Sequence, residues 1–189
     1  MRDRLTDQIA RNPATGEFWR FLHVTGGAVG GDGTFENPFG EVTAGVAISQ
    51  SAGNDVIYVD GGTNPGLNGF IIPDQVRVLS TGVVQSLDIA DVGQVQLPGS
   101  GTGTLPRLDG ATITNGGFTG QVAMGNNRQL SGFNVITTGV NQRGILGLTL
   151  PGLKARGFLA HRVHLPRIPC EVLHRGGSLP KRYFRCAPP

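Results

Sequence analysis

The amino-acid sequence predicts an all-β fold, and three observations lead to this prediction. Glycine occupies 31 of the 189 positions, and only 15% of the residues are charged. Apolar residues occur in short runs that are separated by turn residues, and a helical period appears in one segment only. Helical bundles are instead rich in Ala, Glu, Lys and Leu, so this composition is typical of a β chain with many tight turns.

The N-terminal part of the chain predicts a linker, a strand and one short helix. Residues 1–24 are interpreted as an exposed linker that leads into a strand near its end. Asn37 is a good N-cap and Pro38 a good first helical residue, and apolar residues then recur at i, i+3 and i+7. These signals predict a helix over residues 38–51, which we expect to cap the open end of a stack of strands.

Four strands are predicted after the helix, over residues 55–60, within 70–79, over 105–114 and within 122–136. Their apolar centres are Ile57, Leu79, Leu108 and Leu130, and the first and last intervals between these centres are equal, whereas the middle one is longer. A recurrence of this kind predicts the stacked coils of a solenoid, one of which carries an extra loop. Each coil is too short to bury its own apolar face, so stacking creates the core.

Two stretches of the sequence carry a family resemblance. GGDGTFENPFGEV, the short helix after it and GNDVIYVDGGTN resemble the start of right-handed parallel β-helix domains of the pectate-lyase-like superfamily. AMGNNRQLSGFNVITTGVNQRGI is similar to the internal rungs of those domains. The resemblance covers residues 25–147 and implies a right-handed parallel β-helix, or solenoid, with a short N-terminal capping helix. The residues after 147 depart from the pattern of such rungs, so we expect a solenoid that is truncated after about four coils.

The same region is similar to the passenger region of bacterial inverse-autotransporter-type surface proteins. RDRLTDQIARNP resembles the last strand and linker of an outer-membrane barrel. This resemblance implies a location at the cell surface or outer membrane, an upstream outer-membrane barrel domain, and a surface glycan or a protein as ligand. Charged side chains are spread over the start of the chain, from Arg2 to Arg20, with no apolar core among them, so we expect no signal peptide in this chain.

Residues 148–189 form a third predicted region, a basic tail rich in Pro, Arg and Leu. The net charge is −4 over residues 1–143 and +7 over residues 144–189, and the latter segment has no Asn or Asp. Because composition changes so abruptly, we interpret the tail as disordered or translated from another reading frame. The division is therefore 1–24, 25–147 and 148–189.

An alternative interpretation gives this tail a zinc-binding or nucleic-acid-binding role. Residues 181–186, KRYFRC, mix cations with aromatic rings, as nucleic-acid-binding segments do. Imidazole and thiolate groups suit zinc, although their spacing matches no known zinc signature. The residues with such groups are His161, His164, Cys170, His174 and Cys186.

Candidate sites in the body are weak. Residues 26–34 hold one Gly-Asp turn of the kind that binds calcium, but such sites need adjacent copies. Residues 99–104, GSGTGT, lack the elements of a nucleotide-binding loop. His23 lies in an apolar segment where we expect a half-buried structural role.

A polysaccharide lyase or hydrolase of the β-helix type is the enzymatic alternative. It would need carboxylates placed near each other and near a cation, but Asp is also a common turn residue. We therefore expect a non-enzymatic structural or adhesive segment of a larger bacterial surface protein. We expect no catalytic, cofactor-binding or metal-binding residue, no cofactor, and no nucleic-acid partner for the body. The carboxylates and cations considered are Asp60, Asp74, Asp88, Asp91, Asp109, Arg77 and Arg107.

Overall fold

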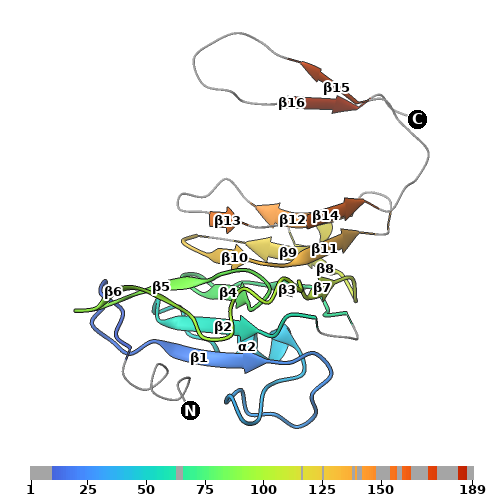
Figure 1. The fold of residues 1–189 in the computed structure, drawn as a ribbon. Coiled ribbons are helices and arrows are strands. Elements are labelled where there is room, and N and C mark those ends of the chain that lie inside the picture. Colours follow the sequence, from blue (N-terminus) through green and yellow to red (C-terminus); the bar gives the residue numbers. More distant parts are fainter. Residues whose placement is uncertain are drawn as a thin grey trace.

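The computed structural model describes residues 10–62, 66–115, 117–124, 126–137, 139 and 142–147, together with the backbone of four later strands (Figure 1). Within these residues the fold is all-β, with a single short helix, as the composition predicts. The four later strands are β13 (Lys154–Arg156), β14 (Leu159–Arg162), β15 (Cys170–Leu173) and β16 (Tyr183–Cys186).

The largest sheet is parallel throughout and has five strands in the order β1-β2-β4-β10-β13. Figure 1 shows these strands as successive layers that follow the colour of the chain. Leu22, Ile57, Val78, Leu130 and Ala155 lie in one row across it. Its first four strands are β1 (Arg20–Val24), β2 (Asp55–Val59), β4 (Arg77–Ser80) and β10 (Gln129–Ser131).

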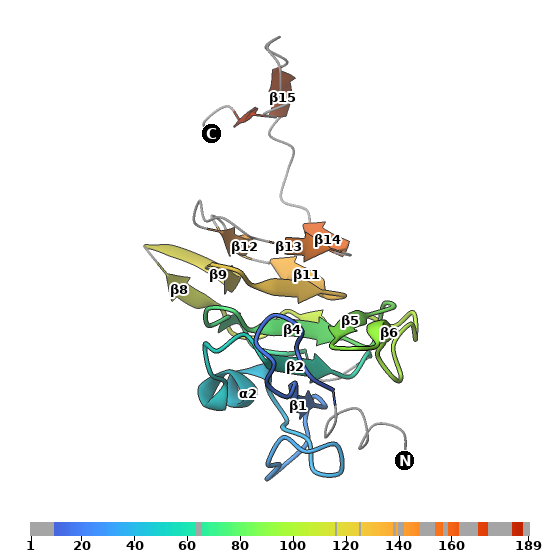
Figure 2. The ribbon, with the colours of Figure 1, turned by 90° about the vertical axis from the view of Figure 1, so that its left-hand side faces the viewer.

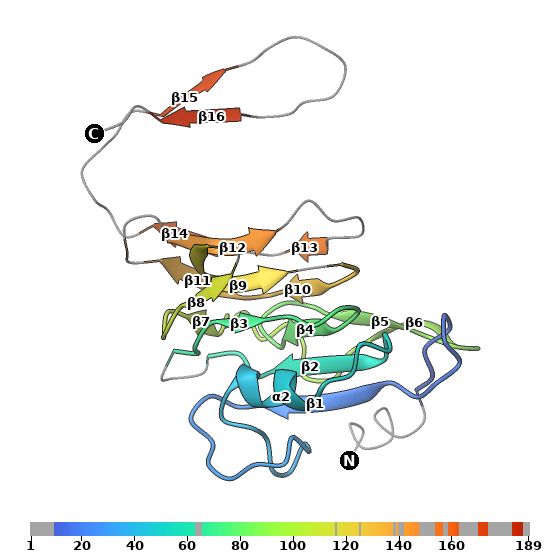
Figure 3. The same ribbon diagram turned by 180° about the vertical axis from the view of Figure 1, so that it is seen from behind.

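Two further sheets contain parallel strands in the orders β14-β11-β7 and β12-β9-β3, and the second sheet has a fourth strand, β8, which pairs antiparallel with β9. The chain visits the three sheets in turn, first as β4, β7 and β9 and then as β10, β11 and β12 (Figures 2 and 3). These strands are β7 (Arg107–Leu108), β11 (Asn134–Thr137), β3 (Phe70–Ile71), β9 (Phe118–Met124) and β12 (Arg143–Gly147).

Two antiparallel excursions interrupt this order. The hairpin of β5 (Ser86–Ile89) and β6 (Gly93–Gln96) leaves after β4, and β8 (Ile113–Asn115) pairs with the start of β9. The hairpin has its own antiparallel register, from Ser86 opposite Gln96 to Ile89 opposite Gly93. Both excursions lie between Val78 and Leu130, which are direct neighbours in the large sheet.

The predicted row of apolar centres is wrong at two positions. Ile57 pairs with Val78 rather than Leu79, and Leu108 pairs with Val135 in a different sheet. The physical reason is that Val78 and Leu79 are both fully buried, on opposite faces of the same strand. Hydrophobicity therefore does not distinguish the two registers, although a shift of one residue exchanges the faces.

β2, the second strand of the large sheet, is buried on both faces. Ile57 and Val59 belong to the inner core between the sheets, whereas Val56 and Tyr58 belong to a second core on the outer face. The β5–β6 hairpin covers that outer face, and the Tyr58 hydroxyl donates to the carbonyl of Pro98 at 2.9 Å. Burial on both faces explains the unbroken apolar run in β2.

The helix α2 (Val42–Ile48) is shorter than the predicted 38–51. Residue Asn37 is not its N-cap, because the Asn37 carbonyl accepts hydrogen bonds within the preceding loop, from Asp32 N at 3.0 Å and Gly33 N at 3.1 Å. Glu41 takes the N-cap position without a side-chain cap, and its carboxylate instead accepts from Asn68 Nδ2 at 3.0 Å. The side chain thus ties the helix start to the segment before β3.

α2 packs beside β1, β2 and β3 (Figure 2). Val42 is fully buried in the inner core, and Val46 packs against the same core. The outer edge of β1 is bonded by the loop before the helix rather than by the helix, through the bridge between Val24 and Phe39. Phe39 lies within the predicted range 38–51 but before the observed helix, so the hydrogen bonds to this edge come from the residues that precede α2.

The division of the chain into the regions 1–24, 25–147 and 148–189 stays a prediction. β1 ends at Val24 and pairs along its length with β2, and β13 and β14 pair with β10 and β11. In the part of the chain that the structure describes, no helix has the length and apolar character needed to cross a membrane.

Candidate functional site

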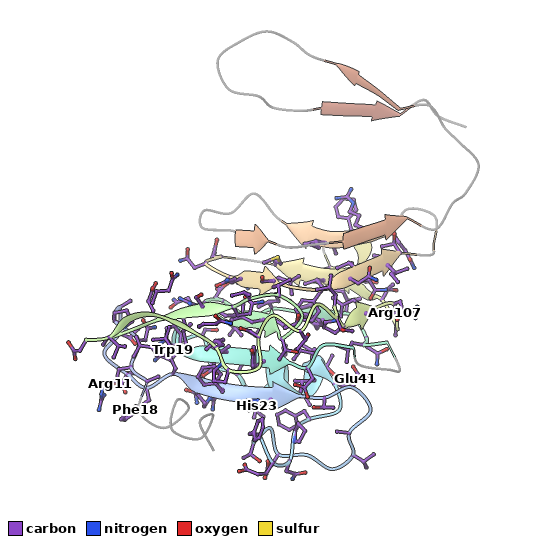
Figure 4. All side chains as sticks on the ribbon, in the orientation of Figure 1. Arg11, Phe18, Trp19, His23, Glu41 and Arg107 are labelled. Atoms are coloured by element: carbon purple, nitrogen blue, oxygen red, sulfur yellow. The ribbon has the colours of Figure 1, made fainter. Side chains whose placement is uncertain are left out.

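An open groove runs along the outer edge of β1, with Arg11 and Phe18 at one end of this strand and His23 farther along it (Figure 4). The groove has a volume of about 1020 Å³. The residues that line it come from the approach to β1 and its first half, the covering loop, and the turn between α2 and β2. They are Glu17, Phe18, Trp19, Arg20, Phe21, Thr34, Phe35, Glu36, Gln50, Ala52, Asn54 and Asp55.

The main chain of β1 forms one side of this groove. Even-numbered residues of the strand bond toward β2: the amide of Arg20 donates to Asn54 O at 2.9 Å, and Asp60 N donates to Val24 O at 2.9 Å. Neighbouring residues in a strand direct their main-chain groups to opposite sides. The odd-numbered residues of β1 therefore direct their N–H and C=O groups away from the sheet.

Two separate segments bond to this outward edge. Trp19 N donates to Ala10 O at 2.7 Å, and His23 N donates to Gly33 O at 2.8 Å. Phe21 lies between these two positions. Among the described residues, none forms a hydrogen bond with the outward N–H or C=O of Phe21.

The segment before β1 is held in place by Asn12. Its Nδ2 donates to Gly53 O and to Asn54 Oδ1, both at 3.0 Å, and its Oδ1 accepts from Ala14 N at 2.9 Å. Thr15 Oγ1 adds a second hydrogen bond to Asn54 Oδ1 at 2.6 Å. These bonds fix the end of the groove that carries Phe18.

An ion pair between the partly exposed Arg20 and the buried Asp55 stiffens the floor. Arg20 Nε donates to Asp55 Oδ1 at 2.9 Å, and its Nη2 donates to Asp55 Oδ2 and to Ile48 O, the latter at 2.7 Å. The Asp55 side chain is only 5% exposed and also accepts from Gln50 N at 2.6 Å. The bidentate geometry holds both groups and neutralises their charges against each other.

Aromatic rings border the groove at both ends. Phe18 is 45% exposed and Phe35 is 51% exposed. The Arg11 guanidinium lies 3.9 Å from the centroid of the Phe18 ring, and the Phe35 ring meets His23 edge-on at 5.4 Å. Exposed rings next to carboxylates favour cationic and amphipathic groups.

The loop that covers the outer edge of β1 through Gly33 is shaped by a turn at Asp32. Asp32 Oδ1 accepts from the amide of Thr34 at 3.0 Å and from its hydroxyl at 2.7 Å. The backbone hydrogen bond from Thr34, followed by its side-chain bond, lowers the pKa of the Asp32 carboxyl. The carboxylate of the predicted calcium-like turn is thus engaged in loop structure. No group of three or more potential metal ligands occurs among the residues that the structure describes.

The carboxylates considered for catalysis are not brought together. Asp74 pairs with Arg128 at 2.6 Å, and Arg107 pairs with Asp109. Asp60 accepts a hydrogen bond from the Thr25 hydroxyl, and Asp91 sits in a turn with φ of 63°. Each group therefore serves local structure, and the described residues offer no observation that favours a glycan-cleaving site. The carboxylate left over is Asp88, which lies near Arg77.

Arg77 lies under the β5–β6 hairpin. Its guanidinium is 4.6 Å from the centroid of the Trp19 ring, and Trp19 Nε1 donates to Asp88 O at 3.0 Å. Burial lowers the pKa of Arg77, and the charge of Asp88 opposes this change. Arg77 thus belongs to the outer core rather than to a site with Asp74.

The tail residues considered for zinc are described only in part. His161 lies in β14, and the register of β15 and β16 places Cys170 opposite Cys186. His164 and His174 lie outside the described residues.

The glycine-rich segment 99–104 packs against Thr81, whose carbonyl accepts a hydrogen bond from Gly101 N at 2.8 Å. This contact gives the segment a structural role.

Sequence reasoning did not identify the groove. Its one visible signal is the mixture of charged and aromatic residues in Glu17-Phe18-Trp19-Arg20-Phe21. No protein family, curated protein or solved structure matches this chain.

Proposed function

We propose that the chain is a non-enzymatic structural or adhesive segment, built as the first coils of a right-handed parallel β-helix. In this proposal it belongs to a larger bacterial cell-surface or outer-membrane-associated protein. The observation that carries the proposal is the order in which the chain visits three parallel sheets, β4-β7-β9 and then β10-β11-β12.

The spacing of the paired residues supports stacked coils. Ile57 pairs with Val78 and Leu130 pairs with Ala155, and these two intervals along the chain are similar in length. The much longer interval from Val78 to Leu130 contains the two antiparallel excursions. Stacking of this kind satisfies main-chain groups between coils and produces long side faces that suit a stalk or an adhesive surface.

A cysteine cross-link tests the stacked register. In a chain with Cys170 and Cys186 replaced by Ser, we expect the pair Arg107→Cys and Asn134→Cys to form a disulfide on mild oxidation. These two positions are register partners in adjacent parallel strands, which are about 4.8 Å apart. The matched pair Arg107→Cys and Ile136→Cys is two residues out of register, so we expect it to remain reduced. Equal cross-linking of both pairs would contradict the stacking.

Display on a bacterial surface tests the adhesive role. The full chain, fused to an outer-membrane anchor, is expected to increase retention of cells on immobilised surface glycans or proteins. The same cells should release no new reducing sugar ends from a panel of acidic and neutral polysaccharides. Release of such ends, lost in the Asp74→Asn or Arg77→Ala chain, would replace this proposal by the glycan-cleaving alternative.

A further inference from the structure

We propose that Cys170 and Cys186 form a disulfide bond that closes the hairpin of β15 and β16. These two residues are the only cysteines of the chain, and the antiparallel register of the two strands places them directly opposite each other. The hairpin is a sheet that shares no strand with the three parallel sheets. The proposal therefore does not depend on the proposed structural or adhesive role.

The spacing of opposite positions in the hairpin suits a disulfide. Figure 3 shows β15 and β16 side by side and running in opposite directions. In an antiparallel pair, the Cα atoms of directly opposite residues are about 5.5 Å apart where the residues share hydrogen bonds and about 4.5 Å apart where they do not. A disulfide needs Cα atoms about 4.4–6.8 Å apart. Both kinds of position lie within this range, so the register alone brings the two cysteines to a suitable separation.

The other register pairs of the hairpin are also matched in chemistry. Opposite charges, and aromatic residues opposite aliphatic ones, are favourable cross-strand pairs. The register that pairs cysteine with cysteine also pairs an acid with a base and two aromatic residues with two aliphatic ones. A shift by one residue would separate both the cysteines and the opposite charges. These pairs are Glu171 with Arg185, Val172 with Phe184, and Leu173 with Tyr183.

A pair of strands on its own needs further support. Among the described residues, β15 and β16 pair only with each other. An isolated two-stranded hairpin is marginally stable in water at best. A disulfide restricts the unfolded chain and stabilises units that are too small to build a core. Cys170 begins β15 and Cys186 ends β16, so the bond holds the open end of the ladder, where fraying would start.

Formation of the bond needs an oxidant, and a small disulfide such as oxidised glutathione supplies it. The thiolate of one cysteine attacks a sulfur of this disulfide, forms a mixed disulfide and releases one glutathione thiolate. The second cysteine thiolate then attacks the protein sulfur of the mixed disulfide, forms the Cys170–Cys186 bond and releases the second glutathione thiolate. The chain loses two electrons and two protons, which glutathione disulfide gains as it becomes two thiols. Because disulfides persist in oxidising compartments, we expect the bond in an exported chain and two thiols in a cytoplasmic one.

Mass spectrometry of the full chain tests the bond directly. The chain is reduced, equilibrated with mixtures of oxidised and reduced glutathione, quenched in acid and alkylated. We expect a monomer without alkylated cysteine, whose tryptic digest contains residues 168–175 linked to residues 186–189. A disulfide-linked dimer, or two free thiols in the most oxidising mixture, would overturn the proposal. Thiols that become reactive only after a chelator is added would assign both cysteines to a metal ion and would equally overturn it.

A shifted cysteine tests the register. The double variant Cys186→Ser and Arg185→Cys keeps two cysteines, but position 185 lies opposite Glu171 and on the other face of the hairpin from Cys170. A flexible chain would close both bonds with equal ease, because the loop lengths differ by one residue. We expect the native pair to have an effective concentration at least about tenfold higher than the shifted pair, measured from the glutathione ratio at half oxidation. Equal values would contradict the register, and Arg185→Ser controls for loss of the charge pair.

Hydrogen exchange separates the hairpin from the stacked sheets. When Ser replaces both Cys170 and Cys186, we expect amide protection in β15 and β16 to fall at least about tenfold, whereas protection in β2 stays unchanged. Unchanged protection in β15 and β16 would refute the closure of the hairpin by this bond. The cross-linking test of the stacked sheets uses a chain without these two cysteines, so the failure of one proposal is distinguishable from the failure of the other.

Discussion

Replacement of Trp19 by Ala is expected to open the outer core. Trp19 is 1% exposed, its ring lies under Arg77, and its Nε1 donates to Asp88 O at 3.0 Å. Removal of a buried Trp side chain costs about 3–5 kcal/mol. The Asp88 carbonyl also loses its partner, which adds about 1 kcal/mol where water does not replace the indole. We therefore expect the free energy of unfolding to fall by about 4 kcal/mol or more.

Urea unfolding followed by circular dichroism measures this loss, and hydrogen exchange locates it. Because Trp19 packs beneath the β5–β6 hairpin, we expect amide protection to fall first in Ser86–Ile89 and Gly93–Gln96. Phe18→Ala is the matched control, since Phe18 is 45% exposed, and we expect it to cost less than about 1 kcal/mol. Similar losses in both variants, or an unchanged hairpin, would refute the assignment of Trp19 to this core.

Three further predictions follow from contacts around the groove. Asp55→Asn removes the charge-assisted hydrogen bonds from Arg20, so we expect it to lower the free energy of unfolding by about 1.5–3 kcal/mol in a urea titration. A change below about 0.5 kcal/mol would contradict the stabilising role of the ion pair. The pKa of Asp32 is lower in the folded chain than in the unfolded chain, so its carboxylate stabilises the loop at pH values above the unfolded pKa, and this contribution is lost as the pH falls through the folded pKa. The NMR shift of the Thr34 amide should change as Asp32 is protonated in acid, and Asp32→Asn should remove this pH dependence. Gly40→Ala would place a Cβ 2.0 Å from Ala28 O, so we expect it to lower the free energy of unfolding by about 1–3 kcal/mol, measured by thermal unfolding. Unchanged stability of this variant would show that the segments of Ala28 and Gly40 do not meet.

The class of fold can be predicted from the sequence, but its register cannot. The apolar run at 55–60 and the strands within 70–79 and 122–136 occur close to their predicted places. Val78 and Leu79 are both buried because the hairpin that follows β4 covers the outer face of the sheet. Hydrophobicity alone does not show which of the two residues faces the inner core, and so the predicted partner of Ile57 lies one residue away from its true partner.

The start of the helix and the existence of the groove could not be predicted from the sequence, for a related reason. Local signals favour a helix start at Asn37 and Pro38, but the hydrogen bonds that the loop makes to the edge of β1 keep this segment extended up to Phe39. The groove depends on where two separate segments bond to the edge of β1, and neither contact has a sequence signal. What the sequence does show is a mixture of aromatic and charged residues before and within β1, which is the chemistry of the groove without its geometry.

The edge of β1 also bears on how a stack of parallel strands avoids pairing with itself. An exposed strand edge is a template for another strand, and proteins protect such edges with covering segments. On either side of Phe21, Trp19 N donates to Ala10 O and His23 N donates to Gly33 O. A second strand that paired along β1 would have to break both hydrogen bonds. The two covering segments therefore protect this edge, and their contacts with β1 rather than the helix close the end of the stack.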